Sequence, residues 1–392
     1  MTSLVKSDSL YSLDQWRYSL FSFIFVGLFI CNVYAFKYSP YPNQIFWLYV
    51  LLFCLTTYGT FHRSRIAYEE CRKIVLVFAL YICAFYVVSF WELIPGVSIR
   101  ALPTYSLNGM LLVAGFAVGH RLSRNQLFQS FEIIAWLVVF FTVGQWVLEP
   151  STSRFGDNPT AMVVLPFVVA SRKSLVSVCL VVTLLGSQSL TSTIASLLGV
   201  ITYVWLFYRG DIFRFVHLNL KLIVSFLTIG TVGAYLAKDY VYNSLERFQT
   251  HYDPARNFIT ENSKQMLMDS NGIGIGYMNF YGWTSLSGRF RDVGRTGVVI
   301  NGVNLHNSFM TWALEGGVLV CLSVVLMFVL TFRRIRLVSA FDQSLGALFL
   351  SWCTAFGIYA LYHQTHSLMQ FWLCIGLIWG WSAKLRSIRD YG

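Results

Sequence analysis

Long apolar runs recur along the whole chain, and most are separated by short polar connections. A helix crosses a bilayer with about 20 apolar residues. By that measure the pattern predicts about twelve membrane-spanning helices, at residues 16–36, 45–61, 74–93, 104–120, 131–149, 159–171, 174–187, 190–207, 221–237, 307–332, 344–362 and 367–384. The sixth and seventh runs are short and nearly continuous, so ten or eleven helices is the alternative. We expect an all-α polytopic membrane protein that forms a single integral membrane domain over residues 1–392.

The composition supports this class. Of the residues, 56% are hydrophobic and 12% are charged, whereas a soluble globular protein has about 25% charged residues. A soluble enzyme and a disordered protein are therefore excluded. The net charge of +11 does not predict nucleic-acid binding, because lysine and arginine hold the connections of a membrane protein on the cytoplasmic side.

The positive charges also orient the chain. With the N-terminus in the cytoplasm, the short connections on the cytoplasmic side carry most of the lysines and arginines, among them Arg63, Arg172 and Arg334. We therefore predict that both termini are cytoplasmic. The one long connection, residues 238–305, lies between the ninth and tenth predicted helices and is extracytoplasmic. Long connections in compact proteins usually carry function.

The long loop holds arginines that the topology does not require: Arg256, Arg289, Arg291 and Arg295. The guanidinium group matches phosphate oxygens in a bidentate way. An extracytoplasmic phosphate held close to a membrane indicates a polyprenyl diphosphate. The alternative is a solvated loop face whose arginines form ordinary ion pairs with nearby aspartates.

A histidine marks the end of the loop. His306 directly precedes Asn307 and Ser308, either of which can cap the next predicted helix. The positive end of that helix favours a neutral imidazole, which is the form a general base needs near pH 7. The alternative for His306 is an interfacial position. Glu315, farther along the same predicted helix, lies at a depth where an ionisable group usually has a function. It is expected to orient the neighbours of His306, to pair with an arginine, or to be protonated and hydrogen-bonded.

Three further features are weaker signals. Gly272, Gly274 and Gly276 predict a sharp turn, with a close approach to a phosphate as the alternative. His363 and His366 fit a structural or interfacial role better than a metal site. The outer segments contain no acidic pair of the kind that binds metal in sugar-nucleotide enzymes. We therefore predict no metal and no other cofactor.

These residues resemble a known family. The stretch 305–309, Leu-His-Asn-Ser-Phe, followed by Glu-Gly-Gly at 315–317, resembles the histidine–asparagine signature of the O-antigen polymerase and O-antigen ligase superfamily. Arg256 ahead of Gly272 resembles the arginine that precedes the family's Pro-x-x-Gly-x-Gly segment. The stretch from Arg154 to Pro159 resembles a Gly/Asn-rich stretch before a membrane helix. The resemblance covers roughly residues 150–330.

The resemblance implies an inverting, metal-independent glycosyltransferase in the bacterial inner membrane, with the loop at residues 238–305 in the periplasm. Its donor would be an undecaprenyl-diphosphate-linked oligosaccharide. His306 would be the catalytic base, and Arg256 would hold the diphosphate with Arg289, Arg291 and Arg295. Asn307, Glu315 and Arg154 would support the site. Further partners would be a glycan or lipid A–core acceptor, membrane lipids, a chain-length regulator and a flippase.

The chain departs from the family in two ways, and each departure favours a different function. Ligases of the family tend to have an arginine where this chain has Gln188, which favours a polymerase of O-antigen or exopolysaccharide repeat units. Polymerases often have two large outer loops, whereas one is predicted here, which favours a ligase that transfers the glycan to lipid A–core or a protein. A transporter or flippase is the third hypothesis. It would be expected to have a long cytoplasmic connection between its two halves, where this chain has only residues 171–173. A non-catalytic assembly partner for a polysaccharide synthase is the fourth.

Overall fold

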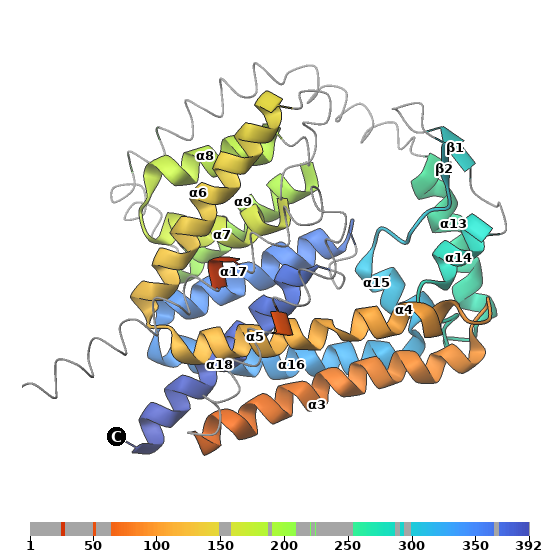
Figure 1. Cartoon of the computed structure of the whole chain (residues 1–392), viewed down its shortest axis with the longest axis horizontal. Helices are drawn as coiled ribbons and strands as arrows, with labels where there is room; N and C mark the ends of the chain where they lie inside the picture. Colours follow the sequence, from red (N-terminus) through yellow and green to blue (C-terminus); the bar gives the residue numbers. More distant parts are fainter. Residues whose placement is uncertain are drawn as a thin grey trace, which may run out of the picture.

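The computed structural model describes residues 25–27, 50–51, 64–148, 158–186, 190–208, 220, 224, 254–286, 291–293, 299–363 and 368–391. This part of the chain is almost entirely helical (Figure 1). The predicted helices at 16–36, 45–61 and 221–237 fall largely outside the described residues.

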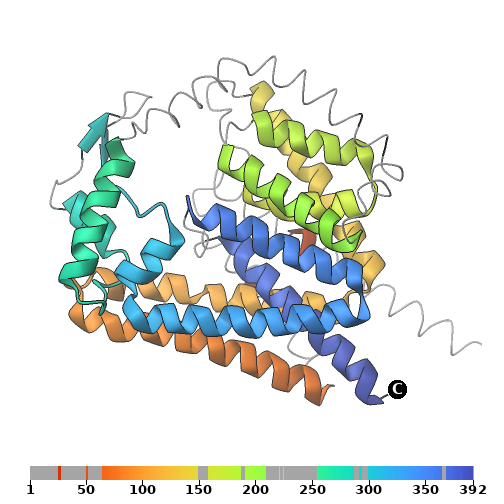
Figure 2. The ribbon, with the colours of Figure 1, turned by 180° about the vertical axis from the view of Figure 1, so that it is seen from behind.

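Four described segments are long and apolar enough to cross a membrane, namely Arg65–Trp91, Val97–Arg121, Arg124–Gly144 and Gly317–Phe341. They consist of α3(Arg65–Val88) with the 3-10 turn η1(Ser89–Trp91), α4(Val97–Ser106) with α5(Asn108–Arg121), most of α6(Arg124–Leu148), and α16(Gly317–Phe341). Figures 1 and 2 show α3, α5 and α16 running side by side with α18(Met369–Tyr391). These segments support the expectation of a membrane protein.

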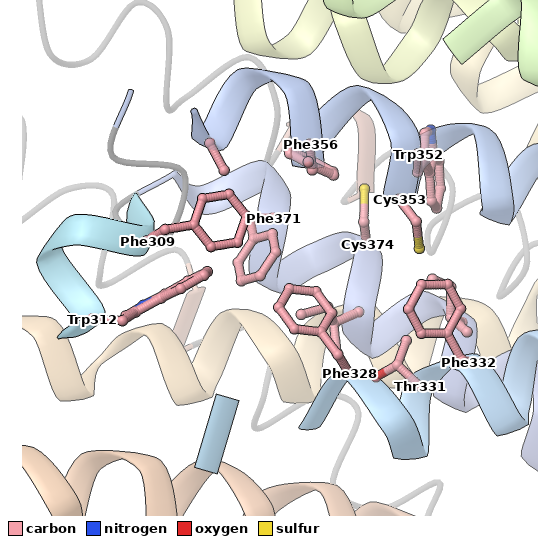
Figure 3. Close-up of a pocket in the computed structure, with 14 residues that line it drawn as sticks. Phe309, Trp312, Phe328, Thr331, Phe332, Trp352, Cys353, Phe356, Phe371 and Cys374 are labelled. Atoms are coloured by element: carbon pink, nitrogen blue, oxygen red, sulfur yellow. The ribbon is translucent and has the colours of Figure 1, made fainter. Parts of the chain in front are cut away.

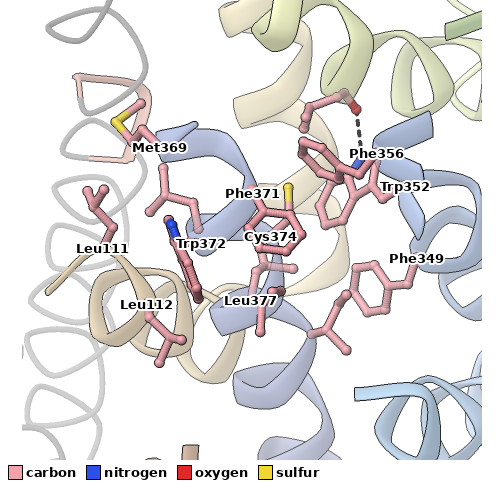
Figure 4. Close-up of a cluster of buried hydrophobic side chains, with 14 of the residues drawn as sticks. Leu111, Leu112, Phe349, Trp352, Phe356, Met369, Phe371, Trp372, Cys374 and Leu377 are labelled. Atoms are coloured by element: carbon pink, nitrogen blue, oxygen red, sulfur yellow. Dashed lines mark hydrogen bonds between the residues drawn. The ribbon is translucent and has the colours of Figure 1, made fainter. Parts of the chain in front are cut away.

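Four further helices form a second group, in which α17 and α7 contact the bundle. They are α7(Asn158–Ala170), α8(Ser174–Gly186), α9(Leu190–Phe207) and α17(Gln343–Ala360). Helix α17 packs against α9 and α7, and the buried indole of Trp352 donates a hydrogen bond to the carbonyl of Val163 (2.8 Å; Figure 4). Helices α7, α8 and α9 begin and end within about one residue of the predicted apolar runs, because each run is bounded by polar residues or proline.

Glycines allow α5 and α18 to approach closely. Gly115 and Gly119 lie on α5, and Gly376 and Gly380 lie on α18. A Cβ atom at Gly115 or Gly119 would overlap the carbonyl oxygen of Leu373 or Leu377, respectively. This spacing of four residues is the small-residue pattern typical of packed membrane helices. Since both contacts advance in the same direction along the two helices, α5 and α18 are parallel.

A buried carboxylate joins three helices at the end of the bundle where α3 begins, which we call the Arg65 end. Glu70 on α3 is 4% exposed. It binds Lys73 (2.8 Å), Arg334 on α16 (2.5 Å) and Arg386 on α18 (3.1 Å). The opposite end of the bundle, where η1 ends, is called the Trp91 end.

The long loop contains secondary structure of its own. Helices α13(Pro254–Asp269) and α14(Asn279–Leu286) are followed by the strands β1(Arg291–Val293) and β2(Val299–Asn301), which pair antiparallel with Arg291 opposite Asn301. These elements lie at the Trp91 end, on the right of Figure 1. This short β-ribbon is a small exception in the described part of the chain, whose helical content agrees with the predicted all-α class.

The predicted helix at 307–332 is interrupted near its start and extends beyond its predicted end, to Phe341. The chain first forms α15(Ser308–Met310) and the π-helix η2(Thr311–Glu315), and α16 begins only at Gly317. Gly317 has φ +64°, a left-handed conformation that interrupts the helix and that glycine adopts without strain. Glu315 therefore lies before the segment Gly317–Phe341, which is long and apolar enough to cross a membrane, rather than within it. Similarly, the predicted helix at 74–93 begins earlier, at Arg65, where the hydroxyl of Ser64 caps it.

Candidate functional site at the Trp91 end

The glycine-rich segment forms a tight turn against the start of α16. Gly272, Gly274 and Gly276 all have positive φ, at 76°, 101° and 93°. A Cβ atom at Gly274 would lie 2.8 Å from the amide nitrogen of Gly317. This confirms the prediction of a sharp turn. At Gly274 the glycine also allows backbone to pack closely against backbone, whereas at Gly276 a Cβ atom would overlap the side chains of Ser98 and Asn279.

Glu315 accepts hydrogen bonds from the backbone at the start of α14. Its carboxylate oxygens accept from the N–H groups of Met278 (3.0 Å) and Phe280 (3.1 Å). The residue is only 2% exposed. Burial raises the pKa of Glu315 to about 7, and the two N–H donors act in the opposite direction. Of the roles expected for this residue, the hydrogen-bonded one is found, and its partners are backbone groups.

The loop is also tied to the turn between α3 and α4. The side chain of Asn279 accepts from the N–H of Ile94 (2.6 Å) and donates to the hydroxyl of Ser98 (3.0 Å). Glu92 accepts from the N–H of Ser98 (2.9 Å). Burial opposes ionisation of Glu92, but the hydrogen bonds to its carboxylate outweigh it and lower its pKa.

Aromatic side chains complete this attachment. The ring of Tyr277 stacks on that of Tyr105, with centroids 4.8 Å apart. The hydroxyls of Tyr105 and Tyr81 lie 2.7 Å apart. The Tyr81 hydroxyl also accepts a hydrogen bond from the indole of Trp312 (3.1 Å). The loop, the bundle and η2 are thus linked by one chain of buried contacts.

A small apolar cluster brings the two main candidate residues into the same part of the fold. Its buried members are Ile259, Ile275, Phe280, Val303, Leu305 and Leu314. Arg256 lies on α13 about one helical turn before Ile259, and His306 directly follows Leu305. Helix α13 also contacts η2. The segments that carry Arg256 and His306 therefore share one packed cluster.

His306 is exposed, and the residues after it fix its position. The side-chain oxygen of Asn307 accepts from the N–H of Met310 (3.0 Å), so the predicted helix cap is confirmed. The amide of Asn307 donates to the carbonyl of Leu361 (3.0 Å), and the hydroxyl of Ser308 donates to the carbonyl of His363 (2.9 Å). These bonds hold the start of α15 against the end of α17. His363 thereby comes close to the site, although its sequence pattern indicated only an interfacial role.

The dipole of a long helix does not begin at His306, contrary to expectation. The helix that His306 precedes, α15, has three residues and continues as the π-helix η2. The long helix α16 begins only at Gly317, and dipole effects fall off within the first turn. The helix dipole therefore gives no support for a neutral His306.

An apolar groove begins next to this site. It lies between α16, α17 and α18 and encloses about 50 Å³. At one end it is lined by Phe309 and Trp312, and at the other by Phe332 (Figure 3). Phe309 is three residues after His306. The sequence does not reveal this groove, because a side chain that lines a groove and one that packs in a core are equally apolar.

The other predicted arginines are placed only in part. Arg291 lies on β1, opposite Asn301 on β2. Asn301 is five residues before His306. Arg154, Arg289 and Arg295 lie outside the described residues, and so does Gln188.

No protein-family model matches the chain, and no curated protein matches it either. The case for a function therefore rests on the arrangement of residues. An exposed imidazole, an arginine-bearing helix and the mouth of an apolar groove meet at the Trp91 end. This combination suits a substrate with a reactive polar head, an anionic group and a long apolar chain.

Proposed function

We propose that the protein is an inverting, metal-independent glycosyltransferase that uses an undecaprenyl-diphosphate-linked oligosaccharide as its donor. The observation that carries the proposal is the shared apolar cluster, in which the segments bearing Arg256 and His306 pack together. We further propose that the enzyme is a polymerase of O-antigen or exopolysaccharide repeat units.

In the proposed reaction, a hydroxyl of the acceptor glycan attacks the anomeric carbon of the donor sugar from the side opposite the diphosphate. The new carbon–oxygen bond forms as the bond between sugar and diphosphate breaks, which inverts the anomeric centre. His306 removes the hydroxyl proton as general base. Arg256, supported by Arg289, Arg291 and Arg295, compensates the charge that develops on the departing diphosphate. Undecaprenyl diphosphate leaves, and the proton on His306 is released to solvent.

The apolar groove supports a lipid-linked donor. It begins near His306 and continues between α16, α17 and α18, where an isoprenoid chain would remain in an apolar environment. Phe309 and Phe332, which line it, are 47% and 42% exposed.

The proposal includes the location and the membrane layout. The protein would lie in the bacterial inner membrane with about twelve helices, both termini in the cytoplasm and the Trp91 end in the periplasm. In support, the basic residues that contact Glu70 lie at the Arg65 end, and connections rich in such residues remain in the cytoplasm. A chain-length regulator and a flippase would be its partners.

The ligase is the second candidate, because the loop elements α13, α14 and the β-ribbon all belong to one outer connection. A ligase would use the same base and the same donor, and only its acceptor would differ: lipid A–core or a protein.

The first experiment is a polysaccharide gel of a deletion strain that carries His306→Ala. Membrane expression is checked in parallel. His62→Ala, on the side predicted to be cytoplasmic, is the matched control and should restore the full ladder as wild type does. We expect His306→Ala to leave acceptor with a single repeat unit, which is the loss of polymerisation.

Other outcomes discriminate among the alternatives. Bare acceptor together with accumulated long lipid-linked polymer would identify a ligase. An unchanged ladder would contradict the role of His306 as the base. If repeat units accumulate only on the cytoplasmic side, the protein is a flippase and not a transferase.

A further inference from the structure

Several backbone hydrogen bonds attach the glycine-rich segment to the segment around the start of α16. The N–H of Val318 donates to the carbonyl of Gly272 (2.9 Å). In the other direction, the N–H groups of Ile275 and Gly276 donate to the carbonyls of Leu314 (2.9 Å) and Glu315 (3.1 Å). The carboxylate of Glu315 adds bonds from two more N–H groups, at residues 278 and 280.

The glycine-rich segment is continuous with α13. At the end of α13 the N–H of Ser270 donates to the carbonyl of Met266 (2.9 Å), and that of Ile273 donates to the carbonyl of Ser270 (3.0 Å). Because no unbonded stretch separates them, the position of the turn determines the position of α13 and hence of the backbone at Arg256.

Backbone hydrogen bonds also connect Glu315 to the segment that follows His306. The N–H of Thr311 donates to the carbonyl of Asn307 (3.0 Å), and the N–H of Gly316 closes the π-helix by donating to the carbonyl of Thr311 (3.3 Å). A π-helix inserts one extra residue into a helical turn and often occurs at functional sites. In η2 the turn ends on Glu315, the residue whose carboxylate reaches α14.

We propose that Glu315 is a positioning residue, which sets the arginine-bearing helix α13 relative to His306 by binding the backbone N–H groups of Met278 and Phe280. This inference rests on the proposed function. Glu315 does not touch the substrate in this role. Its carboxylate links the segment that carries Arg256 to the segment that carries His306. These two segments have to approach the donor from different sides.

The test uses the full-length protein in detergent and compares Glu315→Ala, Glu315→Gln and Glu69→Ala. Glu69 is the matched control, because it is a partly exposed glutamate at the opposite end of the bundle that pairs with the exposed Arg65. Hydrogen–deuterium exchange is followed for peptides that cover residues 275–282 and, as an internal reference, α5 and α18. Transfer from a synthetic polyprenyl-diphosphate oligosaccharide is measured on the same preparations.

We expect Glu315→Ala to accelerate exchange in residues 275–282 by about 10-fold or more, since the N–H groups of Met278 and Phe280 lose their acceptor. Exchange in α5 and α18 should stay unchanged, whereas general unfolding would accelerate both. Because the active site would be misaligned but not blocked, kcat should fall by about 100-fold with KM within about threefold. Glu315→Gln retains one acceptor oxygen and should restore about a tenth of the wild-type kcat.

Two results would overturn the proposal. Unchanged exchange at residues 275–282 in Glu315→Ala would show that the carboxylate does not hold this segment. Accelerated exchange with unchanged kcat would show that the attachment exists but does not position the catalytic groups. If the wild-type protein transfers no glycan at all, the proposed function fails and the positioning role fails with it, while the exchange data still decide whether Glu315 holds the loop.

Discussion

At the scale of single residues, Glu315 illustrates how backbone N–H groups can satisfy a buried carboxylate. Its two oxygens accept from backbone N–H groups, which are fixed donors that need no side-chain ordering. Burial nevertheless disfavours the charged form. The balance leaves the pKa of Glu315 at about 7, above the ordinary value of 4.5.

This raised pKa predicts how stability depends on pH. Between about pH 4.5 and 7 the folded protein holds a proton that the unfolded chain has released, so stability is greatest below that window and is lost as the pH rises through it. The slope should reach about 1.4 kcal/mol per pH unit. Thermal unfolding of wild type and Glu315→Gln from pH 4.5 to 8 measures it. The free energy of unfolding of the wild type, minus that of Glu315→Gln, should fall with rising pH. A difference that does not change with pH would contradict the prediction.

At the scale of elements, the packing of α5 against α18 depends on glycines. The backbones are so close that a side chain at these positions meets a carbonyl oxygen, which cannot rotate away as a side chain can. Helix association in a bilayer relies on such close packing because lipid and side chain are equally apolar.

The variant Gly119→Val should therefore force α5 and α18 apart. We expect a loss of about 3 kcal/mol in the free energy of unfolding, at the upper end for overpacked sites. Gly144→Val on α6 is the control, because a Cβ atom at Gly144 would meet no atom within 4 Å. Thermal unfolding in detergent measures both variants. Equal stability of the two would show that the helices separate without cost.

At the scale of the whole molecule, one buried charge holds the Arg65 end together. Glu70 contacts cationic groups from its own helix, from α16 and from α18. The side chain of Arg334 is itself largely buried and also lies over the ring of Trp379 (4.7 Å). Removal of one partner from a buried ion pair leaves an uncompensated charge.

Glu70→Ala should thus destabilise the protein by about 3–5 kcal/mol. The adjacent Glu69→Ala should cost less than about 1 kcal/mol, because the pair of Glu69 with Arg65 is exposed. Chemical unfolding monitored by tryptophan fluorescence compares the two. A similar effect of both variants would mean that water reaches the Glu70 site.

The sequence predicts features that depend on local signals. The cap at Asn307 and the turn at Gly272 were predictable because the residue type alone favours them. The start of α16 was not, because Trp312, Ala313 and Leu314 continue the apolar pattern without interruption. The break at Gly317 depends on the contact with Gly272 and Ile273, more than 40 residues earlier.

The candidate site shows the same division. The sequence singled out His306 and Arg256 by residue type and by their place in the outer loop. That their segments approach each other depends on the packing of Ile259, Leu305 and Leu314, and apolar residues carry no signal of which partner they select. The hydrogen bonds of Glu315 likewise depend on partners about 35 residues away.

The position of α18 has a consequence for biosynthesis. Its indole rings at Trp372 and Trp379 are among the most deeply buried side chains, yet every other described helix leaves the ribosome before it. The earlier helices therefore lack this packing partner until α18 has been made and packs parallel to α5. A nascent chain that stalls before Met369 therefore leaves the apolar surface that α18 covers without its partner.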